Sequence, residues 1–305
     1  MSVTRVSTFN LQQQTLGNAL NTQARLFGTQ EQISSGFRTS TFSGLGAGQT
    51  EALTSTDDTL SRINTFLQNN AIIASRTNSQ SQAVDNIIDI TTETRNIIVA
   101  ARNGTSTDNA GFIRQLESQF QNLAGQLNIN LENRFLFGGI RTDTPPVDTS
   151  SFPELTNDEG IPEAGYYRGS DQNTLIRLQD GFELEVQARA DDPAIQSIFA
   201  GLAVAREGLE EENDEKIGQS IDLISQGLEQ ISLLQVELAS INVNLDQSAD
   251  RLQRQELYLQ GVRDSLISTD LLSASTQVAI DQGILQAAFQ SFSRINSLSL
   301  SQFLN

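Results

Sequence analysis

The strongest pattern in the chain is a branched aliphatic residue at every seventh position from residue 217 onward. A seven-residue repeat keeps one stripe of a helix facing a partner helix, so it predicts a helix of the coiled-coil type. A second row starts apolar at Ile221 and Leu228 and becomes polar at Gln235, Asn242 and Glu256. A helix of about 50 to 60 residues would be on the order of 75 to 90 Å long. The first row consists of Ile217, Ile224, Ile231, Leu238, Leu245, Leu252, Leu259 and Leu266.

Shorter stripes predict further helices in the rest of the chain. One helix in the N-terminal half carries Leu53, Leu60 and Leu67, and another follows the turn at Asn103–Gly104. The two ends of the chain have narrow apolar stripes among Gln, Asn, Ser and Thr. Such helices bury too little surface to offset their ordering entropy alone, so we expect them to need each other or neighbouring chains. The stripes at the ends are Phe9, Leu16, Leu20 and Phe27, then Leu285, Phe292 and Ile295.

The heptad positions allow two interpretations. They can form the core of an ordinary helical bundle, or part of the stripe can lie between chains. Helix length and the polar positions Gln235, Asn242 and Glu256 favour the second interpretation, because polar residues in a coiled-coil stripe weaken pairing and set its register. Periodicity alone leaves the choice open.

A segment of different composition separates the two helical halves. Residues 135–190 contain four of the five prolines, and Thr174–Leu178 and Phe182–Val186 alternate apolar and polar residues around Asp180–Gly181. This alternation predicts a β-hairpin. Asp192 and Pro193 then form a helix start, with a capping carboxylate and proline at the first helical position. We therefore expect a mainly α fold in which long paired N- and C-terminal coiled-coil helices (1–134 and 191–305) flank a small β-rich central insert (135–190).

The composition excludes several classes of chemistry. The chain has no Cys and no His, and its formal net charge is −18. It therefore has no imidazole base, thiolate nucleophile or Cys/His zinc site, and its charge disfavours nucleic acid and anionic membranes. No stretch approaches the roughly 18 apolar residues of a membrane helix. The first 20 residues lack a basic cluster and an apolar stretch, so no cleaved secretory signal is expected.

No segment predicts a catalytic, cofactor or metal site. Gly44, Gly46 and Gly48 resemble a dinucleotide-binding loop, but Gln49 stands where the third glycine belongs, so a connector is expected. The acidic run Glu210–Glu215 lacks the spacing of a calcium loop. Ser34 and Ser35 have no histidine to activate them. We expect a protein that is not an enzyme and has no cofactor.

Four stretches resemble the flagellin superfamily, and within it the hook-associated protein 3 family, over nearly the whole chain. Thr29–Arg38 is similar to a helix-ending Ser-Gly-x-Arg segment, with Ser35, Gly36 and Arg38 at its positions. Tyr167–Asp171 is similar to a Tyr-x-Gly-Asp segment with Ser170 inserted, and Ile295–Leu300 resembles the closing helix. The family commonly has an Asp-Asp-Pro stretch after this first segment, and this chain lacks it after Arg38. The most specific passage, Asn133–Pro146, includes Asn133, Arg134, Phe135, Phe137, Gly138, Thr142, Pro145 and Pro146.

The resemblance implies a structural subunit of the bacterial flagellum at the junction of hook and filament. It implies that the terminal helices pair into a tube while residues 135–190 project outward. Its expected partners are a hook-side junction protein, flagellin, copies of itself and an export chaperone, and export would use an uncleaved N-terminal region of the chain. A short flagellin and, more distantly, a chemoreceptor-type coiled coil remain alternatives. A chemoreceptor-type coiled coil does not explain the β-rich insert.

Overall fold

The computed structural model describes residues 2–39, 41–104, 109–150, 164–186 and 188–304. Within these ranges, side chains are described from residue 10 to residue 294, except those of residues 12, 42 and 43. The chain is mainly α-helical, as expected. In chain order the elements are α1 (Ser2–Ser35), a 3-10 helix η1 (Phe42–Leu45), α2 (Ala47–Asn103), α3 (Asn109–Leu127), β1 (Asn130–Leu131), β2 (Arg134–Phe135), β3 (Thr174–Gln179), β4 (Phe182–Val186), α4 (Pro193–Glu210), α5 (Asp214–Ile267) and α6 (Leu271–Leu304).

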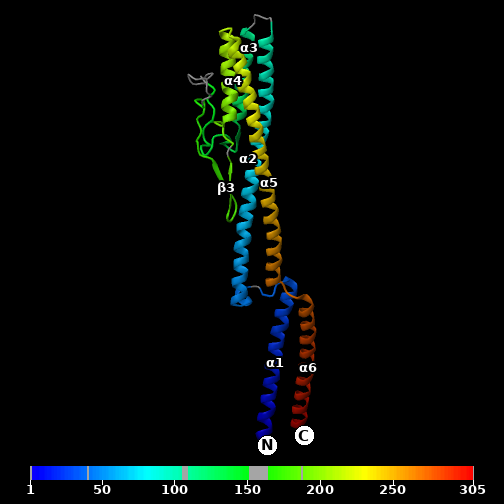
Figure 1. The fold of residues 1–305 in the computed structure, drawn as a ribbon. Coiled ribbons are helices and arrows are strands. Elements are labelled where there is room, and N and C mark those ends of the chain that lie inside the picture. Colours follow the sequence, from blue (N-terminus) through cyan, green and yellow to red (C-terminus); the bar gives the residue numbers. More distant parts are fainter. Residues whose placement is uncertain (1, 40, 105–108, 151–163, 187, 305) are drawn as a thin grey trace. The chain divides into compact units, whose positions relative to one another are not determined.

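The chain divides into two compact units, which are described separately. The terminal unit comprises Met1–Arg62 and Gln255–Asn305, and the central unit comprises Ile63–Arg254. In the central unit, α3 and α4 lie beside the parts of α2 and α5 that belong to it (Figure 1). In the terminal unit, α1 and α6 lie side by side.

The core of the central unit is apolar and fully enclosed. The rings of Phe120 and Phe199 lie 5.2 Å apart between centroids, and Tyr166 meets Phe199 edge-on at 4.6 Å. Heptad residues of α5 complete this core, because Ile224, Ile231 and Leu238 are all 0% exposed. These positions are therefore the interior of a bundle within one chain, the simpler of the two interpretations of the heptads.

Glycines allow α4 and α5 to pack closely. A Cβ atom at Gly201 would lie 2.7 Å from Ile224 Cγ1, and one at Gly227 would lie 2.5 Å from Ile198 Cγ1. The start of α4 matches the expectation from sequence: Asp192 Oδ1 accepts a hydrogen bond from Ala194 N at 2.8 Å, and Pro193 occupies the first turn.

The insert contains the predicted hairpin. Strands β3 and β4 are antiparallel, with Thr174 opposite Val186 and Ile176 opposite Leu184. Ile176, Leu178 and Val186 face the core, whereas Leu175 and Arg177 are exposed. Asn70 of α2 donates hydrogen bonds to Leu178 O and to Ser248 Oγ of α5, both at 3.3 Å. This buried amide fixes the hairpin against the two long helices.

Candidate assembly interface

Where side chains are described, the surface between α1 and α6 buries only alanines and polar residues. The buried residues there are Ala19, Thr22 and Thr29 of α1 and Ala274 and Asp281 of α6. The two threonines hydrogen-bond to the carbonyl four residues earlier in their own helix, so their hydroxyl groups are satisfied without a partner helix. Burial of such side chains supplies little hydrophobic free energy.

One ion pair joins the two helices at a defined point. Arg25 donates from Nε to both carboxylate oxygens of Asp281 at 3.1 and 3.0 Å, and from Nη2 to Oδ1 at 2.6 Å. Gln277 Nε2 donates to the same carboxylate at 2.9 Å. The Asp281 side chain is 0% exposed and that of Arg25 is 51% exposed. The hydrogen bonds from Arg25 hold the pKa of Asp281 below its usual value, against the opposite effect of burial. A fork-shaped contact of this kind fixes the register of two helices.

Large apolar side chains of the terminal unit are exposed instead of buried. Leu16, Leu20 and Phe27 of α1 are 49%, 56% and 61% exposed. They are the very residues of the predicted stripe. On α6, exposed apolar residues recur along its length: Leu271, Leu272, Ile280, Ile284 and Phe289. Among the described side chains these three residues of α1 stay largely exposed, so the exposed faces of α1 and α6 form the candidate assembly interface.

The other predicted stripe residues divide into three groups. Leu53, Leu238, Leu245 and Leu252 are buried within one chain, so their burial requires no second copy. Phe9 and Ile295 lie outside the described side chains. The half-buried group is Leu60, Leu67, Leu259, Leu266, Leu285 and Phe292. The sequence pattern did not distinguish these groups. It also did not predict the ion pair of Arg25 and Asp281 or the exposed apolar residues of α6 named above.

The first family-like motif forms a joint in the terminal unit. Gly36 follows α1 with φ of 76°, a conformation that glycine adopts without strain. Its carbonyl accepts a hydrogen bond from Thr269 N at 2.9 Å, and Arg38 N donates to Ile267 O at 2.8 Å. Arg38 Nε also donates to Ser268 O at 2.8 Å, while exposed Ser35 caps the turn through a hydrogen bond from Phe37 N. The motif therefore ties the end of α1 to the connection between α5 and α6.

The second motif builds the base of the insert. Asn133 has φ of 61° in the two-residue turn between β1 and β2, where Leu131 pairs with Arg134. Phe135 N donates to Thr142 O, and Ala190 N donates to Phe137 O, both at 2.9 Å. Phe137, Gly138 and Pro146 are buried, whereas Asn133, Arg134 and Pro145 are exposed. Most of the motif thus serves the fold of the subunit.

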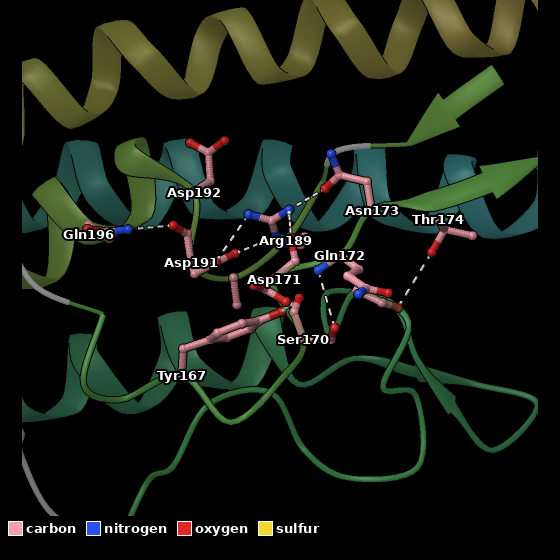
Figure 2. Close-up of polar contacts among 12 residues, drawn as sticks. Tyr167, Ser170, Asp171, Gln172, Asn173, Thr174, Arg189, Asp191, Asp192 and Gln196 are labelled. Atoms are coloured by element: carbon pink, nitrogen blue, oxygen red, sulfur yellow. Dashed lines mark hydrogen bonds and ion pairs between the residues drawn. The ribbon is translucent and has the colours of Figure 1, made fainter.

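Arg189 organises the polar contacts that follow the hairpin (Figure 2). Its Nε donates to Asp191 Oδ1 at 2.7 Å, and its Nη1 donates to Asp171 O at 2.9 Å and to the side chain of Asn173. Tyr167 O–H donates to Ser170 O at 2.8 Å, and burial raises the pKa of Tyr167 to about 12. These hydrogen bonds join the segment before the hairpin to the segment after it, so the cluster supports the fold.

The described residues contain no cluster of His, Cys, Asp and Glu that could hold a metal ion. No described helix is both long and apolar enough to cross a membrane.

Comparison with known proteins finds a family match for the N-terminal part of the chain. Residues 6–142 match the family model of the bacterial flagellin N-terminal helical region. This match covers a little under half of the chain, so its N-terminal helical region is similar to that of the bacterial flagellins.

Two solved structures share the fold. A protein assigned as a flagellar hook-associated protein of Vibrio parahaemolyticus superposes with a TM-score of 0.58 at 18% identity, over 72% of this chain and 98% of that one. FlgL of Bacillus cereus superposes with a TM-score of 0.54 at 14% identity, over 70% of this chain and 100% of that one. No curated protein sequence matches the chain. At these identities the two structures establish the fold only.

Proposed function

We propose that this chain is a non-enzymatic structural subunit of the junction between the flagellar hook and filament, and that it polymerises through the helices at its two ends. The observation that carries the proposal is the exposed apolar stripe of Leu16, Leu20 and Phe27 on a helix whose pairing surface with α6 is polar. The hook-associated proteins named above have the same fold, which supports the junction over other positions in the organelle.

The helix pair α1–α6 supplies the mechanism. Arg25 and Asp281 set the register of the pair while its apolar side chains stay available to other subunits. Complete burial of an exposed Leu or Phe contributes about 1.5 to 3 kcal/mol, and assembly would bury the part of each side chain that is still exposed. A tubular polymer needs heterologous contacts, in which one face of a subunit meets a different face of the next, and the unlike stripes of α1 and α6 provide two such faces.

The proposal includes specific partners and a location. The partners are a hook-side junction protein, flagellin on the filament side, copies of the chain and an export chaperone. The subunit acts outside the cell as part of the flagellum, and it reaches that place without cleavage of its N-terminus. Residues 1–134 and 191–305 form the helical regions, and residues 135–190 form the outer domain.

Reconstitution tests the proposal. Full-length protein is mixed with candidate hook-side junction proteins and flagellins, and the products are viewed by electron microscopy. Short caps on the hook-side partner are expected, and flagellin should extend them. Removal of residues 1–30 or 275–305 should abolish assembly while circular dichroism still reports the folded insert. Long filaments from the chain alone would identify a flagellin instead, and normal assembly of either truncated chain would contradict the mechanism.

A further inference from the structure

A basic groove lies in the central unit between α2 and the two β-hairpins. Its volume is about 500 Å³, and its walls come from α2, β2, β3 and Val186 of β4. Arg76, Arg134 and Arg177 all line it, although the chain as a whole has a net charge of −18.

The arginines are only partly neutralised. Arg76 Nη2 lies 3.3 Å from Glu132 Oε2, and Arg177 Nη2 lies 3.0 Å from Glu183 Oε1. Those carboxylates are 65% and 48% exposed, so water screens both pairs. Arg134 is exposed and forms no ion pair within the described part of the chain. Arg76 Nε is buried without a hydrogen-bond partner. The residues that line the groove include these three arginines and no aspartate or glutamate, so the lining itself is basic.

Apolar side chains make the groove suited to a protein segment. Ile72 and Leu175 line it and are 43% and 69% exposed. A partner that supplies carboxylates on a short projecting turn would bury these side chains and pair with the arginines. Arginine forks hold carboxylates with two parallel hydrogen bonds, which gives such a contact a defined geometry.

The same chain carries a turn with this chemistry. The connection from α4 to α5 contains five carboxylates within Glu210–Glu215. Glu212 has φ of 54° and is exposed, and so are Asp214 and Glu215. These three carboxylates form no ion pair in the described residues, whereas Glu211 pairs with Lys216 at 2.8 Å. The free carboxylates thus gather at the tip of a turn between two helices.

The turn cannot reach the groove of its own chain. Asp214 begins α5, and Ser248 of the same helix contacts Asn70 beside the groove. The two residues are 34 positions apart, which corresponds to about 50 Å of helix. We propose that the acidic turn Glu210–Glu215 of one copy docks in the arginine groove of a second copy, displaced by about 50 Å along the helix axis. This inference rests on the proposed function, because it requires copies that assemble.

Cysteine cross-linking of the full chain tests the contact, because the natural sequence contains no cysteine. One chain carries Leu175→Cys in the groove, and a second, tagged to differ in size, carries Glu212→Cys at the turn. After oxidation of the mixture we expect the mixed disulfide dimer at about tenfold or more the yield obtained with Asp222→Cys, a matched exposed acid on α5. Equal yields from the two pairs would overturn the proposal.

Charge reversal provides the second arm. Arg134→Glu with Arg177→Glu in the groove chain should reduce the dimer yield by about tenfold or more, because like charges then meet. Arg114→Glu, at an exposed arginine of α3, is the control and should leave the yield unchanged. Asp214→Arg with Glu215→Arg in the turn chain should restore cross-linking to the reversed groove. Circular dichroism verifies that each variant folds, and an unchanged yield from a folded reversed groove would contradict the contact.

The two proposals fail in different ways. If caps form on the hook-side partner but no mixed dimer forms, the groove contact is wrong and the junction function stands. If the dimer forms but the chain neither caps the hook-side partner nor accepts flagellin, the proposed function is wrong and the copy-to-copy contact stands.

Discussion

The two units of the chain use their apolar residues in opposite ways. In the central unit Phe120, Phe199 and Leu238 are each 0% exposed. In the terminal unit the residues buried between α1 and α6 are alanines, threonines and an aspartate, while Phe27 and Phe289 are 61% and 65% exposed. The central unit therefore has the apolar core of a folded domain. The helix pair of the terminal unit instead has polar and small residues inside and large apolar residues on its surface. Hydrophobic free energy thus stabilises the fold of the central unit, and under the proposed function the exposed apolar residues of the terminal unit supply it to assembly.

The largest expected effect comes from removal of an aromatic ring in the central core. Phe199→Ala should lower the free energy of unfolding by about 3 to 5 kcal/mol, because the cavity adds to the lost burial. Urea unfolding followed by circular dichroism measures the change. Leu233→Ala, on a side chain that is 71% exposed on α5, is the control and should stay within about 0.5 kcal/mol. Equal losses from the two variants would remove the distinction between core and surface in this unit.

A smaller loss is expected where α4 and α5 approach most closely. Gly227→Ala places a methyl group 2.5 Å from Ile198 Cγ1 and 3.1 Å from Ala194 O. Overpacking should cost about 1 to 3 kcal/mol, again by urea unfolding. Gly125→Ala is the matched control on α3, since a Cβ atom there meets nothing within 4 Å. That variant should gain up to about 1 kcal/mol from helix propensity. If Gly227→Ala leaves the free energy of unfolding unchanged, α4 and α5 can move apart at this point at no cost in stability.

The ion pair of the terminal unit should respond to pH while the central core does not. The pKa of Asp281 is lowered by Arg25, so its contribution to pairing is full above the unfolded pKa of about 4 and is lost as pH falls through the folded value. Dyes on Gly17→Cys and Gly283→Cys, two open positions on α1 and α6, report the pairing by energy transfer. Energy transfer should fall on acidification below about pH 4, with the circular dichroism of the central unit retained.

Substitution separates this ion pair from general acid effects. Asp281→Ala should weaken energy transfer at neutral pH and remove most of its dependence on acid. Glu31→Ala, at an exposed carboxylate of α1, is the control and should leave the titration unchanged. If Asp281→Ala retains the full acid transition, the register of the two helices depends on other contacts.

The elements of this fold could be predicted from sequence because local patterns specify them. Alternation gave the β3–β4 hairpin, Asp192 and Pro193 gave the start of α4, and the heptads gave the 54-residue helix α5. Periodicity shows that a stripe exists but does not show what covers it. For this reason Leu238 and Leu16 looked alike in the sequence, although one is 0% and the other 49% exposed.

The candidate site was harder to predict because it depends on contacts between distant residues. Arg25 and Asp281 are 256 positions apart, and no local pattern pairs them. Thr22 and Thr29 are seven residues apart on the buried side of α1, at the spacing that heptad analysis assigns to apolar residues. A search for polar residues at heptad spacing in both end helices would have found this surface. The Asn133–Pro146 motif was recognised, but its hydrogen bonds show a role in folding that the motif alone did not reveal.

The smallest expected effect on the isolated subunit comes from the exposed stripe. Phe27→Ser and Phe289→Ser should each change the free energy of unfolding of the monomer by less than about 0.5 kcal/mol, because water already covers both rings. The same variants should prevent caps from forming on a hook-side partner, since each removes an apolar side chain that assembly would bury. Thr15→Ala, at a half-buried polar position on α1, is the control and should leave assembly unchanged. Normal assembly by both Phe variants would mean that the exposed stripe is ordinary surface, and the contrast between the two units would lose its functional meaning.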